Sequence, residues 1–103
     1  MATISAVLIV KNEADKIEKC LKSIQWADEI VVVDNNSTDN TVKIAKKYAD
    51  KLFIRTGLNN DHVLDNKNFG FKKATKDLVL SIDADEIITE ECKKEILQKM
   101  KEN

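Results

Sequence analysis

Residues 78–86 read Leu78-Val79-Leu80-Ser81-Ile82-Asp83-Ala84-Asp85-Glu86, an apolar run followed at once by acids. The apolar part is typical of a short buried strand. Because side chains alternate across a strand, Asp83 and Asp85 are expected on the same side of its carboxyl end. Hard divalent cations prefer oxygen ligands, and Mg²⁺ is commonly held by one or two carboxylates together with substrate phosphates. The run therefore predicts a strand that ends in a site for Mg²⁺ or Mn²⁺ and a diphosphate-bearing ligand.

Three further apolar runs precede this strand, at Ile4-Val10, Glu29-Asp34 and Lys51-Thr56. They are continuously apolar, which is typical of parallel strands buried on both faces. Helical periodicity fills the segments between and after the strands. The positions on the apolar sides of these helices are Ile17, Cys20, Leu21 and Ile24, then Thr41, Ile44, Ala45 and Tyr48, and finally Cys92, Ile96, Leu97 and Met100. A further helix is expected from about Asp65 to Thr75, and Asp39 is the expected N-cap of the second helix, with Ser37 and Thr38 as alternatives.

Strand-helix alternation predicts an α/β fold, with a Rossmann-like parallel sheet and helices on both faces. A strand order of 3-2-1-4 would place the first and fourth strands beside the crevice where such sheets bind ligands, outside the carboxyl ends of the strands. Three polar clusters follow strands at this edge: Lys11 to Glu13, Asp34 to Asp39, and Asp83 to Glu86. Carboxylate-bearing loops are therefore expected to converge on one crevice.

Length and composition limit the remaining classes of function. The chain has 103 residues, which suits a single domain over residues 1–103. Lys and Arg number 17 against 18 acids, for a net charge of -1, so a general electrostatic footprint for nucleic acid is not expected. The apolar runs are too short to cross a membrane. We expect a protein of the cytoplasm, or one that lies peripherally on the inner membrane face, with Cys20 and Cys92 as buried thiols.

Four ordered motifs resemble one known family. They are Val10-Lys11-Asn12-Glu13, then Val33-Asp34-Asn35-Asn36-Ser37-Thr38-Asp39-Asn40-Thr41, then Asn68 with Ala74, then Ile82-Asp83-Ala84-Asp85-Glu86. In order and spacing they resemble the signatures of family-two, GT-A-type nucleotide-sugar glycosyltransferases. The similarity is strongest to the bacterial branch that builds lipopolysaccharide core and other surface glycans. It runs from about Ile4 to the last helix, and so covers nearly the whole chain.

The resemblance implies a nucleoside site on the first two loops. Val10, Asn12 and Glu13 would border the nucleoside, and Asp34 would accept a hydrogen bond from the base, most simply from N3–H of uracil. Many family members carry a second acid where this chain has Asn35, which leaves the identity of the base open. Asp34 would also suit the start of a turn, and Asn12 and Glu13 would also suit an ordinary turn.

The resemblance also implies how the diphosphate is held. Asp83 would lie near the ribose and the metal, and Asp85 would ligate the Mg²⁺ or Mn²⁺ that bridges the two phosphates. Lys67 stands where the family often has Arg, so it would neutralise the diphosphate as a point charge without a bidentate fork.

By resemblance the chain is a hexosyltransferase-type enzyme that uses a UDP-sugar and inverts the anomeric configuration. In the family the general base and most of the pocket for the glycan or lipid-linked acceptor come from the second half of the domain, so we expect 1–103 to be the nucleotide-binding half. The alternative is a non-catalytic nucleotide- or metal-binding module that self-associates. In either case we expect a homodimer or larger assembly through the fourth strand or the last helix.

Overall fold

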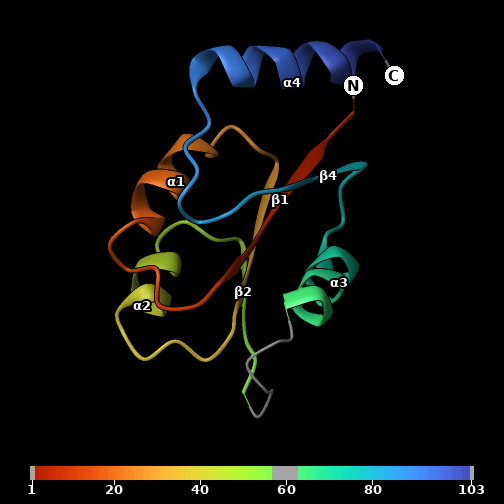
Figure 1. The fold of residues 1–103 in the computed structure, drawn as a ribbon. Coiled ribbons are helices and arrows are strands. Elements are labelled where there is room, and N and C mark those ends of the chain that lie inside the picture. Colours follow the sequence, from red (N-terminus) through yellow and green to blue (C-terminus); the bar gives the residue numbers. More distant parts are fainter. Residues whose placement is uncertain (1, 57–62, 103) are drawn as a thin grey trace.

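The computed structural model describes residues 2–56 and 63–102, and its strands and helices alternate along the chain (Figure 1). The elements are β1 (Ile4–Val10), α1 (Ile17–Ser23), β2 (Glu29–Asp34), α2 (Thr41–Ala45), β3 (Lys51–Ile54), α3 (Val63–Lys73), β4 (Leu78–Ser81) and α4 (Glu90–Glu102). The four strands pair in parallel in the order β3-β2-β1-β4. The predicted α/β class and the 3-2-1-4 order are confirmed.

Helices α1 and α2 cover one face of the sheet, and α3 covers the other (Figure 1). Val32 belongs to the apolar cluster that the strands share with α1 and α2. On the other face a Cβ at Gly70 of α3 would lie 2.7 Å from Cγ1 of Val7 and 3.2 Å from Cγ2 of Val33, so α3 approaches the sheet too closely for a side chain at this position. Consecutive residues of β2 therefore face opposite helices.

Some elements are shorter than the sequence predicts. β3 ends at Ile54 and β4 ends at Ser81, before the expected Thr56 and Ile82. Helix α2 ends at Ala45, because the backbone N–H of Tyr48 bonds three residues back to Ala45 instead of four (3.1 Å), in the tighter turn geometry common at helix ends. The elements themselves all occur where periodicity places them.

A buried acid joins several elements at the amino edge of the sheet. Glu29 opens β2 and is 5% exposed. Its carboxylate accepts hydrogen bonds from Ser5 Oγ of β1 (2.7 Å) and from the backbone N–H of Thr75 (2.9 Å), and it pairs with Nζ of Lys51 of β3 (2.9 Å). Burial by itself raises the pKa of Glu29, but the bonds from Lys51, Thr75 and Ser5 outweigh it and lower this pKa to about 2.

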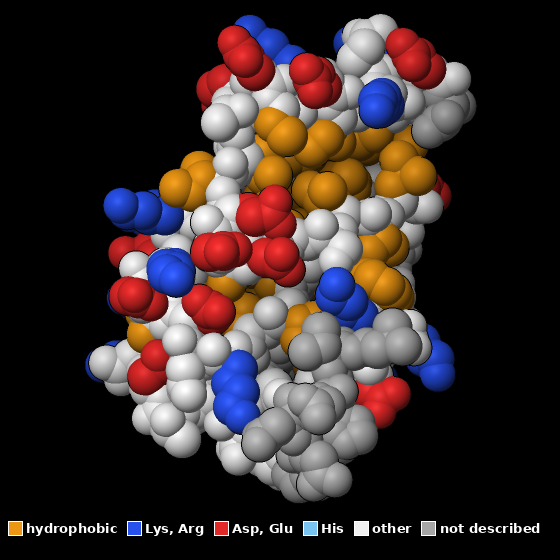
Figure 2. Space-filling model, viewed as in Figure 1, with side chains coloured by type: hydrophobic (Ala, Val, Ile, Leu, Met, Phe, Trp, Pro, Cys, Tyr) orange, Lys and Arg blue, Asp and Glu red, His pale blue; other side chains and the backbone are white. Residues whose placement is uncertain are grey.

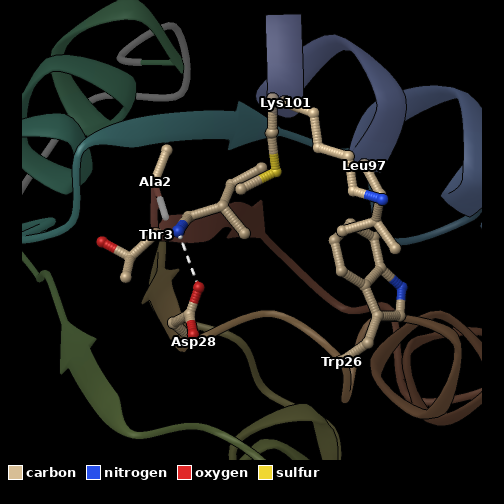
Figure 3. A pocket seen from close by; sticks show the side chains of 8 residues that line it. Ala2, Thr3, Trp26, Asp28, Leu97 and Lys101 are labelled. Carbon is tan, nitrogen blue, oxygen red and sulfur yellow. Dashed lines mark hydrogen bonds between the residues drawn. The ribbon is translucent and has the colours of Figure 1, made fainter. Parts of the chain in front are cut away.

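An apolar hollow lies beneath α4, which crosses the amino edge of the sheet (Figures 1 and 2). The hollow has a volume of about 710 Å³ and is lined by Ala2, Thr3, Ile4, Trp26, Asp28, Leu97, Met100 and Lys101 (Figure 3). No residue of α4 is fully buried. The apolar side of α4 is therefore only partly covered by the described residues.

Strand β4 lies at an edge of the sheet. It pairs with β1 on one side, and its Val79 is 44% exposed. None of the helices in the described part of the chain has the length and hydropathy needed to cross a bilayer.

Candidate functional site

The loops that follow β1 and β2 are hydrogen-bonded to each other at the carboxyl edge of the sheet. The backbone N–H of Asn12 donates to Ser37 Oγ (2.8 Å), and that of Glu13 donates to Thr41 Oγ1 (2.9 Å). In return, Oδ1 of Asn12 accepts a hydrogen bond from the backbone N–H of Thr38 (2.7 Å). Two of the predicted polar clusters therefore form one surface, which we call the interlocked loops (residues 11–16 and 35–40).

Two asparagines in the interlocked loops have left-handed backbone conformations. The φ angle is 52° at Asn12 and 55° at Asn36. Asparagine tolerates this region better than most residues that carry a side chain. The Asn12 carboxamide oxygen is already bonded to Thr38, so the first role of Asn12 in this structure is to hold the two loops together.

Asp34 closes β2 with a carboxylate that is bonded within its own turn. The residue is 1% exposed, and its oxygens accept hydrogen bonds from the backbone N–H (2.9 Å) and from Oγ (2.5 Å) of Ser37. The turn that the sequence allows for Asp34 is thus present. A contact between this carboxylate and a base would have to use the remaining lone pairs of a buried group.

Asp39 is not the N-cap that the sequence predicts. The N-cap of α2 is Asn40, whose side chain makes no capping hydrogen bond. The Asp39 carboxylate instead accepts hydrogen bonds from the hydroxyl and the backbone N–H of Thr41 (the latter 3.0 Å) and from the backbone N–H of Ala14 (3.3 Å). These bonds, the Thr41 hydroxyl first, lower the pKa of Asp39. Asp39 therefore accepts the backbone N–H of the first residue of α2 from one position before the N-cap. It also bonds the start of α2 to the loop after β1.

The acids after β4 lie in a turn and not on an extended strand. The backbone N–H of Glu86 donates to the carbonyl of Asp83 (3.0 Å), and the backbone N–H of Asp83 donates to Oε1 of Glu86 (2.9 Å). Ile82 and Ala84 are buried, at 3% and 4% exposure, whereas Asp83 and Asp85 are exposed. The two aspartates thus emerge together because the apolar residues before and between them anchor the turn. We call residues 83–86 the acidic turn.

Cys20 of α1 lies directly behind the acidic turn. Its Sγ donates to the carbonyl of Asp83 (3.5 Å), and the side chain is 0% exposed. Burial, followed by the charges of Glu86, Asp85 and Asp83, raises the pKa of Cys20 to about 12. Cys20 is the buried thiol that the sequence predicts, whereas Cys92 is only half-buried; both are free. The charges of all three carboxylates of the acidic turn therefore act on the Cys20 thiol.

The carboxylates of the acidic turn suit a cation that shares its ligands with a substrate. Within residues 2–56 and 63–102, no three side chains of His, Cys, Asp or Glu are grouped as a metal site. Two exposed carboxylates, Asp83 and Asp85, are what Mg²⁺ commonly takes from a protein when phosphates and waters complete its shell. The donor set fits a shared hard cation and does not fit a closed structural site.

The other predicted site residues come from both faces of the sheet. Val10 ends β1 at 2% exposure, and its carbonyl accepts the backbone N–H of Asn35 (2.8 Å). Glu13 is half-buried, and its carbonyl accepts the N–H of Ile17 at the start of α1 (2.8 Å). Lys67 is half-buried on α3, on the opposite face. Val10, Asn12, Glu13 and Asp34 therefore lie at the ends of β1 and β2 or in the loops that follow them, whereas Lys67 lies on α3.

Two polar residues near this edge have no motif in the sequence that marks them. Arg55 follows β3, and its Nη1 donates to Oδ1 of Asn66 on α3 (3.1 Å). Asn66 is 0% exposed and lies one helical turn before Gly70, on the side of α3 that meets the sheet. The signal in the sequence is a polar residue at an inward helix position, which is visible only once the register of α3 is known.

Comparison with known proteins identifies what this arrangement resembles. The sequence profile described as Glycosyl transferase family 2 matches residues 5–103. An uncharacterized glycosyltransferase of Rickettsia typhi is 39% identical over 97 residues, which are 93% of this chain and 32% of that protein. The chain therefore spans about a third of the length of the curated relatives it matches.

Two solved structures share the fold. S. aureus TarS 1-349 in complex with UDP superposes with a TM-score of 0.78 and 28% identity, over 97% of this chain and 32% of the TarS 1-349 chain. The mannosyltransferase PcManGT from Pyrobaculum calidifontis, in complex with GDP-Man and Mn²⁺, has a TM-score of 0.69 and 27% identity, over 84% of this chain and 28% of that protein. Both neighbours bind nucleotides or nucleotide sugars, and the second also holds a divalent metal.

Proposed function

The chain belongs to glycosyl transferase family 2, and from this premise we propose that it binds the nucleotide-sugar donor of a metal-dependent sugar transfer. One observation carries the proposal: the interlocked loops and the acidic turn stand at the same carboxyl edge of the sheet. In the parallel order β3-β2-β1-β4, the chain adds strands on one side of β1 and then crosses to place β4 on its other side, so the switch point lies between β1 and β4. Open α/β sheets bind their ligands outside the carboxyl ends of the strands at such a point.

Asp83 and Asp85 are the proposed ligands of Mg²⁺ or Mn²⁺. Both are exposed on the acidic turn, and PcManGT was solved with Mn²⁺ beside GDP-Man. Without a cation, carboxylates and a diphosphate repel each other by about 1 kcal/mol per pair of unit charges at 4 Å, even in water. A hard cation, when bound, would bridge these groups and stabilise the departing diphosphate. Lys67 would add a positive charge from α3.

The nucleoside is proposed to lie along the interlocked loops, bordered by Val10, Asn12, Glu13, Asp34 and the nearby Asp83. The hydrogen bonds among these loops support the proposal, since they give a ligand a preformed surface. UDP is the preferred nucleotide, in line with the complex of TarS.

The sugar-transfer reaction itself is proposed for a protein of the relatives' length, of which this sequence matches about a third. The sugar would be a hexose, transferred with inversion to a glycan or lipid-linked acceptor in surface-glycan synthesis, including lipopolysaccharide. These finer points rest on the resemblance of the motifs. None of the described acids is proposed as the general base. The two free thiols support a cytoplasmic setting, where thiols stay reduced.

Self-association through β4 or α4 is also proposed. The support is the open edge of β4, with Val79 at 44% exposure, and the partly covered apolar side of α4. Unpaired strand edges and apolar patches favour pairing with another chain.

Titration of UDP with and without Mn²⁺, followed by nuclear magnetic resonance of the ¹⁵N-labelled chain, tests the donor site. We expect shifts in the interlocked loops and the acidic turn that depend on Mn²⁺. Asp85→Ala should abolish the metal-dependent part, because only one proposed ligand of the cation remains.

Glu95→Ala is the matched control, since it removes an exposed carboxylate on α4, away from the carboxyl edge. It should bind UDP and Mn²⁺ like the unchanged chain. Equal metal-dependent binding by Asp85→Ala would show that the acidic turn is not the metal site.

A further inference from the structure

The third acid of the acidic turn, Glu86, is bonded to the turn itself. Its Oε1 accepts a hydrogen bond from the backbone N–H of Asp83 (2.9 Å), and its own backbone N–H donates to the carbonyl of Asp83 (3.0 Å). Both backbone groups of Asp83 are therefore bonded to the same residue. The proposed function assigns Asp83 and Asp85 to the cation and gives Glu86 no role.

The Glu86 carboxylate bonds the acidic turn on the side of β4 that faces away from β1. The backbone N–H of Ile82 donates toward β1, to the carbonyl of Val7 (3.1 Å). Because the backbone groups of successive residues in a strand point to opposite sides, the N–H of Asp83 points to the open edge of β4. The switch point lies on the other side, between β1 and β4. The bond from Asp83 to Glu86 therefore lies at the outer edge of the sheet and not in the proposed crevice.

Helix α1 holds the acidic turn from a second direction. Sγ of Cys20 donates to the carbonyl of Asp83 (3.5 Å), and Oγ of Ser23 accepts the backbone N–H of Ile88, two residues after the turn (3.0 Å). The Ser23 hydroxyl donates in turn to the carbonyl of Cys20 (2.7 Å). These bonds fix the face of the turn that meets α1, whereas the Glu86 carboxylate fixes its open edge.

We propose that Glu86 is a positioning residue for the metal site: its carboxylate holds the backbone of Asp83, so that Asp83 and Asp85 face the cation together, and it does not itself ligate the cation. The inference rests on the proposed function, because it concerns how the ligands of that cation are oriented. Two carboxylates are enough when phosphates and waters complete the shell of Mg²⁺, and supporting hydrogen bonds hold the ligands of metal sites in place. The turn therefore requires an acceptor oxygen at position 86, and not a negative charge.

Glu86→Gln and Glu86→Ala separate the acceptor oxygen from the charge. Glutamine keeps an oxygen that accepts the N–H of Asp83 and removes the charge, whereas alanine removes both. Nuclear magnetic resonance of the ¹⁵N-labelled chain, without metal or nucleotide, measures the exchange of the Asp83 amide hydrogen with solvent. We expect this exchange to be about tenfold faster in Glu86→Ala, as the loss of one hydrogen bond predicts, and within about twofold of the unchanged chain in Glu86→Gln.

The affinity for Mn²⁺ in the presence of UDP is the second measurement, with free Mn²⁺ followed by electron paramagnetic resonance. Glu86→Ala should weaken Mn²⁺ binding by about tenfold, because the backbone of Asp83 is no longer held. Glu86→Gln should remain within about threefold of the unchanged chain, since the charge of a group that does not touch the cation is screened by water and salt.

Glu90→Ala is the matched control, because it removes an exposed carboxylate at the first residue of α4. It should change neither the exchange of the Asp83 amide nor the affinity for Mn²⁺. A loss of Mn²⁺ affinity in Glu86→Gln as large as that in Glu86→Ala would assign the charge of Glu86 to the cation and overturn the inference alone. Unchanged exchange and affinity in Glu86→Ala would also overturn it. Absence of Mn²⁺ binding by the unchanged chain with UDP would overturn the proposed function and the inference together.

Discussion

Asn12 shows how one residue joins two loops that are far apart in sequence. Its backbone N–H donates to Ser37 Oγ, and that hydroxyl donates in turn to the carboxylate of Asp34. Its side-chain oxygen accepts from the backbone N–H of Thr38 (2.7 Å). The φ of 52° that makes this geometry accessible is unfavourable for most residues with a Cβ. An Asn at this position therefore combines a tolerated left-handed backbone with a side chain that bonds the opposite loop.

Substitutions of Asn12 should separate these two contributions. Asn12→Gly removes the hydrogen bond to Thr38 but keeps the left-handed backbone at no steric cost, so we expect a loss of about 0.5–1.5 kcal/mol. Asn12→Ala removes the same bond and adds strain of about 1 kcal/mol or more, so it should be the less stable variant. Urea unfolding of both variants measures the difference. An alanine variant as stable as the glycine variant would mean that the backbone at Asn12 is not left-handed in solution.

Glu29 joins secondary-structure elements at the amino edge of the sheet, as Asn12 joins two loops at the carboxyl edge. Its carboxylate joins the first residues of β2 to β1, to β3 and to the segment between α3 and β4. Because its pKa in the folded chain is lowered from 4.5 to about 2, the folded state prefers the charged form more than the unfolded state does. Its contribution to stability is therefore complete above about pH 4.5 and is lost as the pH falls toward about 2.

Glu29→Gln should destabilise the fold by roughly 3 kcal/mol at neutral pH, because its pKa falls from 4.5 to about 2 and each unit of pKa is worth about 1.4 kcal/mol. The difference between the variant and the unchanged chain should shrink as the pH is lowered through this window. Urea unfolding at a series of pH values measures it. Glu91→Gln, an exposed acid of α4, is the control and should change stability little at any pH. A Glu29→Gln penalty that is independent of pH would contradict the charge-based explanation.

The molecule as a whole leaves apolar surface at one side of the sheet. Figure 2 shows hydrophobic side chains gathered beneath α4, where Leu97 and Met100 line the hollow. Strand β4 adds an edge with exposed Val79. Surfaces of this kind rarely stay open in soluble proteins.

We therefore expect the chain to self-associate at tens of micromolar, as measured by sedimentation velocity. Val79→Lys or Leu97→Glu should shift the population toward the monomer, since each places a charge on the proposed contact. Ile54→Lys, at a 52% exposed position on the opposite edge strand, should leave the association unchanged. A monomeric unchanged chain, or an equal effect of Ile54→Lys, would argue against β4 and α4 as the interface.

The sequence by itself determined the alternation of strands and helices, the strand order and the placement of acids at the carboxyl edge. Hydrophobic periodicity and chain direction are local properties, and right-handed crossovers between parallel strands then leave few arrangements for four strands. The buried thiol of Cys20 and the exposed Asp83 and Asp85 followed from the same patterns.

Only the tertiary structure decided which polar atoms are already bonded. Asp34 and Asn35 are adjacent in sequence, yet the Asp34 carboxylate is bonded to Ser37, whereas Asn35 bonds through its backbone N–H to the carbonyl of Val10. The burial of Asn66 and the bonds of Glu29 depend on helix register and on contacts across as many as 46 positions. Such contacts form only when distant segments pack together, so no local pattern specifies them.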